Sequence, residues 1–219
     1  MLKGIYTALI TPFKKGNIDF DALEVLLERN IKNGASGFVL LGTTAEPPAL
    51  SEEEKDKILS FCTQKIKGRA KIIVGVGTNS TEHTLQNIKQ ALKYKPDAFL
   101  VVTPYYNKPN LSGMIKHFQL CASYNIPLIL YHIPSRTGQR LSIDFIKKLV
   151  EEVPQIIGIK EADYDIARVV ELATIFKEKL TLFCGNDDLF PLFLSIGAKG
   201  LITAVGNVIL PVFVKIQTL

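Results

Sequence analysis

The sequence predicts an α/β protein of the (β/α)₈ TIM-barrel class. Short apolar runs rich in β-branched residues alternate with segments of helical periodicity, at a repeat length of roughly thirty residues. Several of these runs are apolar throughout, which is typical of parallel strands that are buried on both faces. No glycine-rich nucleotide-binding fingerprint and no P-loop follows a strand. An open doubly wound sheet, the other architecture with this alternation, therefore lacks its usual signature.

The expected strands follow one another at regular intervals along the chain. Each run is bounded by glycine, proline or polar residues, which commonly end strands. The runs are Ile5–Thr11, Gly37–Thr43, Lys71–Gly77, Ala98–Thr103, Pro127–Tyr131, Ile156–Lys160, Leu180–Cys184 and Gly200–Ala204. We therefore expect eight strands and one barrel domain over residues 1–219.

Helices are expected between the strands, for example over Asp21–Asn33, where apolar residues recur at helical spacing. Ser51, Ser112 and Ser142 each precede a helical segment in the manner of an N-cap. After the eighth strand, Pro211 is expected to open a final helix of barely two turns, which makes the eighth helix incomplete. An apolar barrel wall left in water costs roughly 25 cal/mol per Å², so we expect weak stability or burial against another chain.

Composition excludes several classes of protein. The formal net charge is +5, but lysine and arginine are spread along the whole chain, so we expect no nucleic-acid partner. The 3 cysteines are odd in number and far apart, which indicates a reducing compartment rather than a disulfide framework. No apolar run approaches the roughly 18 residues of a membrane span, and no secretory signal is evident. We expect a cytoplasmic protein without a membrane partner.

Polar residues follow the expected strands at their C-terminal ends, where barrels of this class carry reactive groups. Lys160 ends an otherwise apolar strand. A lysine held near the barrel interior loses hydration, and its pKa falls toward that of the neutral amine that attacks a carbonyl. Taken alone, Lys160 could equally reach toward solvent, and Tyr131 could be a buried ring whose hydroxyl bonds to the backbone.

A Schiff-base lyase also needs a proton relay and groups that hold anionic substrates. The hydroxyls of Tyr131, Thr43 and Tyr106 can form such a relay. Thr44 and neighbouring N–H groups can hold a keto-acid carboxylate, and Arg136 can bind a second acidic substrate bidentately. This set needs no cofactor and no metal.

Other polar residues give no support for a metal site. The histidines, His83, His117 and His132, show no metal-ligand spacing, and we assign them surface or packing roles. The adjacent Asp187 and Asp188 are interpreted as a turn or a helix cap. We therefore expect neither a metal nor a cofactor.

Several linked motifs resemble the dihydrodipicolinate synthase family, a group that includes N-acetylneuraminate lyase. In chain order they are TALITPF at 7–13, GTTAE at 42–46, TPYYN at 103–107, YHIPSRT at 131–137, GIKEA at 158–162, and Asn207 before Pro211. The resemblance covers about Gly4 to Pro211 and implies a (β/α)₈ barrel. Family members continue into a C-terminal helical domain that is absent here, so we expect a C-terminally truncated chain.

The resemblance implies a reaction and an assembly. The reaction is a lyase-type condensation of pyruvate with L-aspartate 4-semialdehyde, which gives 4-hydroxy-tetrahydrodipicolinate on the route to diaminopimelate and lysine. The assembly is a homodimer or homotetramer. Implied catalytic roles fall on Lys160 as the imine-forming amine and on Tyr131, Thr43 and Tyr106 as its proton relay, with Tyr106 reaching a neighbouring subunit's site. Implied binding roles fall on Thr44 for the pyruvate carboxylate, Arg136 for the aldehyde's carboxylate, and Gly185 and Ile202 for the pyruvate pocket.

Two alternatives stay open: another pyruvate-dependent aldolase, such as an N-acetylneuraminate or keto-deoxy sugar acid lyase, and a catalytically silent truncated barrel. The adjacent threonines Thr43 and Thr44, in place of the Ser-Thr pair of neuraminate lyases, favour the synthase. Ala45 stands where the family has glycine, and His132 where it has asparagine. If position 45 needs a positive φ, alanine costs about 1 kcal/mol there.

Overall fold

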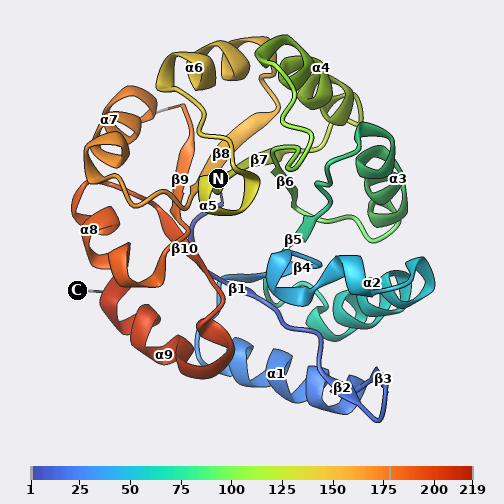
Figure 1. Ribbon diagram of the computed structural model, residues 1–219. Coiled ribbons are helices and arrows are strands. Elements are labelled where there is room, and N and C mark those ends of the chain that lie inside the picture. Colours follow the sequence, from blue (N-terminus) through green and yellow to red (C-terminus); the bar gives the residue numbers. More distant parts are fainter. Residues whose placement is uncertain (1, 178, 219) are drawn as a thin grey trace.

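In the computed structural model, which describes residues 2–177 and 179–218, the parallel strands close into a barrel (Figure 1). Around the barrel they lie in chain order and β10 pairs with β1. Their bounds are β1 (Gly4–Ala8), β4 (Gly37–Leu40), β5 (Lys71–Gly75), β6 (Ala98–Val102), β7 (Leu128–His132), β8 (Ile156–Glu161), β9 (Thr181–Cys184) and β10 (Gly200–Thr203). The predicted barrel is confirmed, and each strand lies inside the expected range or one residue beyond it.

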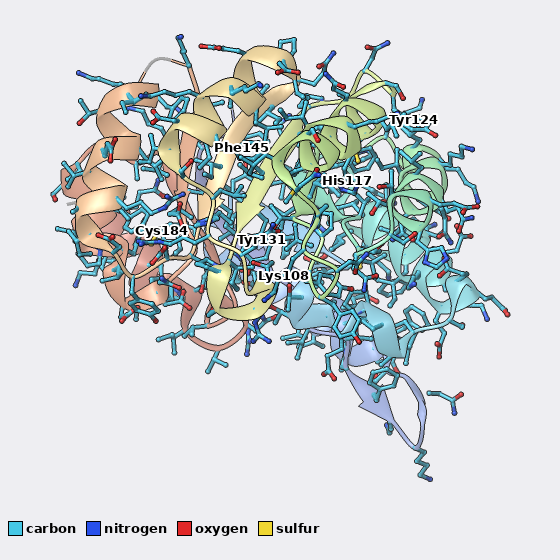
Figure 2. The ribbon with its side chains drawn as sticks, turned by 45° about the horizontal axis from the view of Figure 1, so that its top comes forward. Lys108, His117, Tyr124, Tyr131, Phe145 and Cys184 are labelled. Atoms are coloured by element: carbon cyan, nitrogen blue, oxygen red, sulfur yellow. The ribbon has the colours of Figure 1, made fainter. Side chains whose placement is uncertain are left out.

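Helices surround this barrel (Figure 1). They are α1 (Phe20–Lys32), α2 (Glu52–Ile66), α3 (Thr81–Leu92), α4 (Leu111–Ala122), α6 (Ile143–Glu152), α7 (Ile166–Phe176), α8 (Phe190–Ser195) and α9 (Gly206–Gln217). The short α5 (Pro134–Thr137) follows β7 and lies over the barrel opening. A small antiparallel hairpin of β2 (Phe13–Lys14) and β3 (Asn17–Ile18), which the sequence analysis missed, projects from the barrel (Figure 2). No helix in the described part of the chain is long and apolar enough to cross a bilayer.

Two of the three predicted N-caps are confirmed. The Ser51 hydroxyl accepts from the Glu54 N–H while the Glu54 carboxylate accepts from the Ser51 N–H, a reciprocal capping box. Ser142 caps α6 through a single bond, in which its hydroxyl accepts from the Phe145 N–H. The prediction for Ser112 is wrong, because Asn110 adopts the extended cap conformation and its side chain accepts from Gly113 N–H, which starts α4 at Leu111.

The apolar core has two layers, one inside the barrel and one between barrel and helices. Strand residues alternate between them, as the pleat requires. The inner layer includes Tyr6, Val39, Leu100, Tyr131, Phe183 and Ile202. The outer layer, where strand residues such as Leu40 meet helix residues such as Leu27, is larger. Near the C-terminal end of a strand, the last residue whose side chain faces inward therefore points into the open end of the barrel. The residue next to it points toward the helices.

Helix α9 lies between α8 and α1 and packs on β1 (Figure 1). Its Leu210 and Phe213 are buried, so the bare barrel wall expected after β10 is not observed there. Helical geometry breaks at Ile209, and Pro211 lies in the first turn of the short segment that follows, close to the predicted helix start. The outward face remains apolar, with Val208 74% exposed.

Candidate active site

Lys160 lies near the C-terminal end of β8 and is only 7% exposed. Burial lowers the pKa of its amine to about 8, a shift that Asp187 and Cys184 oppose and that Arg136 reinforces. At pH 8 about half of such amines are neutral, against roughly 0.3% of ordinary lysine amines. The chain therefore holds a lysine that can act as a nucleophile near neutral pH.

Tyr131 on β7 is paired directly with Lys160 across the sheet. The Lys160 Nζ atom lies 4.3 Å from the centre of the Tyr131 ring. Burial raises the pKa of the Tyr131 phenol to about 12, although Arg136 and a hydrogen bond with Thr43 act in the opposite direction. The phenol stays protonated at neutral pH and can donate a proton next to the amine.

A cavity of about 240 Å³ opens beside Tyr131. It is smaller than the ~300–1,000 Å³ pockets that hold drug-sized ligands, so it suits small metabolites. Its lining includes Thr43, Tyr131, Arg136 and the pair Pro47 and Pro48. Lys160 is not among the lining residues, but its amine contacts the ring of Tyr131, which is.

Three other predicted site residues are not among the residues that line this cavity. Thr44 is half-buried in the 3-10 turn Thr43–Ala45 that follows β4. Gly185 follows β9, where an added Cβ would meet the Ala162 Cβ and the Glu161 carbonyl oxygen, each at 2.8 Å. Ile202 is buried in the inner layer with Tyr131. Roles for these three in binding remain predictions.

Tyr106 is the predicted residue that the fold does not bring to the others. It lies on the loop after β6 with a φ of 69° and is 89% exposed. Of the three predicted relay hydroxyls, those of Tyr131 and Thr43 therefore lie together in this chain, and their relay role remains a prediction.

The expected strain at Ala45 is not found. Ala45 has ordinary helical-type backbone in the turn Thr43–Ala45, and the positive φ of 56° belongs to Glu46 instead. The Ala45 carbonyl accepts from the Thr11 hydroxyl at 2.8 Å, which ties the turn to the segment after β1. Alanine at this position therefore carries no left-handed penalty.

Two groups near the site were not identified from the sequence. Asp187 begins a 3-10 turn as expected, but it also faces Lys160 closely enough to affect the lysine pKa. Burial raises the pKa of its own carboxyl, and its Oδ1 atom has no hydrogen-bond partner among the described residues. The proximity of Asp187 to Lys160 could have been inferred only from the assembled barrel.

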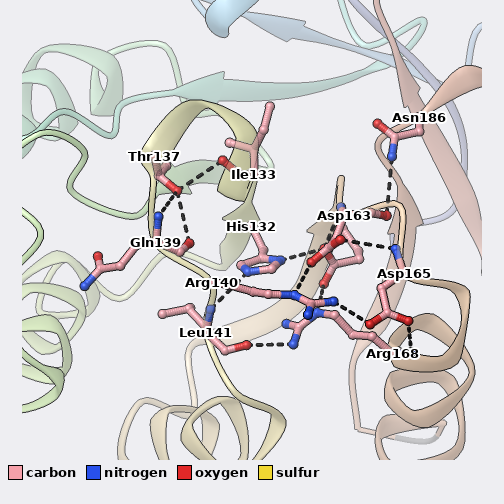
Figure 3. A network of polar contacts seen from close by, with 11 residues as sticks. His132, Ile133, Thr137, Gln139, Arg140, Leu141, Asp163, Asp165, Arg168 and Asn186 are labelled. Atoms are coloured by element: carbon pink, nitrogen blue, oxygen red, sulfur yellow. Dashed lines mark hydrogen bonds and ion pairs between the residues drawn. The ribbon is translucent and has the colours of Figure 1, made fainter.

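The second missed group is a buried set of polar side chains behind β7 and β8 (Figure 3). His132, Glu161 and Asp163 place possible metal-ligand atoms within 4.8 Å of one another. However, His132 Nδ1 lies 2.6 Å from Glu161 Oε1, and His132 Nε2 accepts from the Leu141 N–H at 3.1 Å. Both ring nitrogens are thus engaged by protein groups, and the set is a hydrogen-bonded network.

Fold and site together define a (β/α)₈ barrel with a buried lysine near the C-terminal ends of its strands. The model of the Dihydrodipicolinate synthetase family matches residues 1–217, and the chain belongs to this family.

Individual relatives agree with this assignment. The 4-hydroxy-tetrahydrodipicolinate synthase of Methanocaldococcus jannaschii is 42% identical over 98% of this chain and 74% of its own length. The dihydrodipicolinate synthase structure from Aquifex aeolicus matches with a TM-score of 0.94 and 36% identity, over 99% of this chain and 74% of that chain. The chloride-inhibited dihydrodipicolinate synthase from Acinetobacter baumannii, complexed with pyruvate, matches with a TM-score of 0.95 and 34% identity, over 100% of this chain and 75% of that chain.

Proposed function

We propose that the chain is a Schiff-base-forming 4-hydroxy-tetrahydrodipicolinate synthase that condenses pyruvate with L-aspartate 4-semialdehyde. The observation that carries the proposal is the buried amine of Lys160, whose pKa is lowered to about 8, beside the protonated phenol of Tyr131. Membership in the family and the names of the relatives support the choice of substrates.

The first step is attack of the neutral Lys160 amine on the C2 carbonyl of pyruvate. The carbonyl oxygen takes up a proton to give a carbinolamine and a second proton to leave as water, and an imine remains on Lys160. We assign Tyr131, whose ring contacts the amine, as the proton donor, and its hydrogen bond with Thr43 lets the phenol recover a proton from that side. Thr43 is exposed, so the relay can exchange protons with water.

The second step forms the carbon–carbon bond. Loss of a proton from C3 of the imine gives an enamine, which attacks the aldehyde carbon of the second substrate. The amino group of that substrate then closes on the imine carbon and releases Lys160 as a free amine. Arg136 lines the cavity on α5 and can hold the aldehyde substrate's carboxylate through two parallel hydrogen bonds. Thr44 is assigned to the pyruvate carboxylate.

Assembly belongs to the same proposal. Tyr106 is 89% exposed and cannot serve Lys160 of its own chain in this conformation. We assign it to the site of a second copy, within a homodimer or homotetramer. Sedimentation velocity of the chain and of Tyr106→Ala tests the assembly.

Trapping of the imine tests the proposed chemistry. Purified protein is incubated at pH 8 with pyruvate and borohydride, and the intact mass is measured. The expected result is one pyruvyl adduct per chain that is lost in Lys160→Ala and kept in Lys199→Ala, an exposed lysine just before β10. Folded protein without an adduct on Lys160 contradicts the proposal.

A substrate panel then separates the synthase from related aldolases. Product formation with L-aspartate 4-semialdehyde, in preference to N-acetylmannosamine or sugar-derived aldehydes, is expected. Arg136→Gln is expected to lower the rate with the acidic aldehyde while pyruvate trapping continues, because the guanidinium serves the second substrate.

A further inference from the structure

Behind the pair of Lys160 and Tyr131, the next residues of the same strands form a second pair. Tyr131 is in register with Lys160, and His132 is in register with Glu161. Because side chains alternate along a strand, the first pair points into the barrel and the second points toward the helices. The inner pair is joined by the contact between Nζ and the ring, and the outer pair by the 2.6 Å hydrogen bond between His132 Nδ1 and Glu161 Oε1.

Further hydrogen bonds extend the outer pair into a network that joins four segments (Figure 3). Arg168 on α7 donates from Nε to Glu161 Oε2 at 3.2 Å and from Nη1 to the Leu141 carbonyl at 2.6 Å. The Leu141 N–H returns a bond to His132 Nε2, and the Asp163 N–H donates to Glu161 Oε1 at 2.9 Å. The network thus links the ends of β7 and β8 to α7 and to the segment before α6.

The network fixes the state of His132. Its Nε2 accepts from a backbone N–H and so carries no proton, which leaves Nδ1 as the donor to Glu161. His132 and Glu161 are fully buried, with Arg168 7% exposed. Breaking one bond in such a place leaves a buried polar group unpaired, so the network holds its members in one arrangement.

We propose that His132 is a positioning residue, which acts through Glu161 to hold the C-terminal ends of β7 and β8 so that Tyr131 and Lys160 keep their working geometry. The catalytic importance of this positioning rests on the proposed function. Lys160 and Tyr131 are at or next to the last residues of their strands. The chain leaves the sheet after one further residue on each strand, His132 on β7 and Glu161 on β8, so the bond between these two side chains closes the end of the ladder beside Lys160 and Tyr131. A displacement of about 1 Å at a reacting group can cost about 100-fold in rate.

Two substitutions of His132 separate its two hydrogen bonds. Asparagine places an amide nitrogen near the position of Nδ1, so His132→Asn keeps a donor for Glu161. Glutamine places its amide near the position of Nε2, so His132→Gln keeps a partner for Leu141 and loses the bond to Glu161. The matched control is His117→Gln, since His117 is also buried but lies on α4 and bonds to Thr81.

Two readouts are measured on the 219-residue chain, shown to be folded by circular dichroism. The first is the rate of borohydride trapping with pyruvate on Lys160. The second is the pH midpoint of Lys160 acetylation by trace acetic anhydride, mapped by peptide mass, which needs no pyruvate. We expect His132→Gln to trap at least about tenfold more slowly. We also expect its midpoint to rise from about 8 toward that of an ordinary lysine, as the amine leaves its dry position.

The controls decide between positioning and general stability. His132→Asn should trap pyruvate close to the wild-type rate, and His117→Gln should leave both readouts unchanged. Wild-type trapping and midpoint in His132→Gln overturn the proposal, as does an equal loss in His132→Asn. If His132→Gln does not fold, Arg168→Lys is used in its place. Lysine lacks the planar guanidinium with which Arg168 donates to both Glu161 and Leu141, so this variant also weakens the network. A wild-type rate and midpoint in that variant also overturn the proposal.

Failure of the proposed function has a different signature. In that case the wild-type protein forms no pyruvyl adduct at all. The acetylation midpoints still show whether His132 holds the Lys160 amine in place, because that reaction reports the amine alone.

Discussion

The amine of Lys160 lies 4.3 Å from the centre of the Tyr131 ring, and the two residues are direct partners across β7 and β8. Two opposing effects act on this amine. The ring face favours the charged amine by about 0.5–2 kcal/mol, whereas burial favours the neutral one. The pKa of Lys160 falls to about 8 from 10.5, so burial is the larger effect. The main effect of the Tyr131 ring is then to exclude water from the amine, which also places the amine beside the Tyr131 phenol.

Replacing Lys160 by methionine should stabilise the fold at neutral pH. The pKa of Lys160 is lower in the folded chain than in the unfolded chain. At pH 7 the charged amine therefore destabilises the folded chain, whereas in the unfolded chain water solvates it. Lys160→Met should raise the free energy of unfolding by roughly 2–4 kcal/mol at pH 7. Between pH 8 and 10.5 the unfolded chain binds more protons, so wild-type stability rises relative to the variant and the difference shrinks. Urea denaturation at several pH values measures it.

The exposed Lys199 provides the control for this experiment, since Lys199→Met should change the free energy of unfolding by less than about 0.5 kcal/mol at every pH. A Lys160→Met variant no more stable than wild type at pH 7 would show that the amine is not desolvated.

The barrel itself was predictable because its signals are local. Apolar runs bounded by turn residues located the strands, and Ser51 and Ser142 marked helix starts through bonds to residues three positions away. The position of Lys160 near the end of β8 was predictable for the same reason, because charged residues at the end of an apolar run are visible in the chain. At Ser112 the same rule failed, since Asn110 two residues earlier offered the better cap.

Charge near Lys160 should set the pH at which it reacts. Asp187 favours the charged amine, so Asp187→Asn should lower the pKa of Lys160 below 8 and shift the anhydride-labelling midpoint to lower pH. Arg136 acts in the opposite direction, so Arg136→Gln should raise that midpoint. Asp188→Asn is the control, because Asp188 is exposed on the same turn. A midpoint in Asp187→Asn that moves upward, or not at all, contradicts this electrostatic arrangement.

The adjacent threonines should affect different kinetic constants. Thr43 hydrogen-bonds with Tyr131, so Thr43→Val removes a relay hydroxyl and should lower kcat by about 10²-fold or more with little change in the KM for pyruvate. Thr44 is assigned to the pyruvate carboxylate, so Thr44→Val should mainly raise that KM. Steady-state kinetics with varied pyruvate separates the two, and the reverse pattern contradicts the assignment of roles.

Features that depend on the assembled barrel could not be predicted from the sequence. Asp187 and Lys160 are 27 positions apart in the sequence. They come together only because β8 and β9 are adjacent strands in the barrel. The network behind the site has the same origin, because Glu161 meets His132 across the sheet and Arg168 from α7. Position 45 shows a further limit, since the backbone of the turn places the positive φ one residue later, on Glu46.

Gly185 should tolerate no side chain, because the end of β9 lies very close to the end of β8. The Gly185 N–H donates to the Glu161 carbonyl at 2.8 Å, and an added Cβ would lie 2.8 Å from both that oxygen and the Ala162 Cβ. Gly185→Ala must push the two strands apart next to Lys160, so we expect a loss of about 1–3 kcal/mol in the free energy of unfolding and slower imine trapping. Gly113→Ala is the matched control, since its nearest neighbour, Asn110 Oδ1, lies 3.2 Å away and alanine suits a helix. Equal stability of the two variants in urea would show that the contact between β8 and β9 has room for a methyl group.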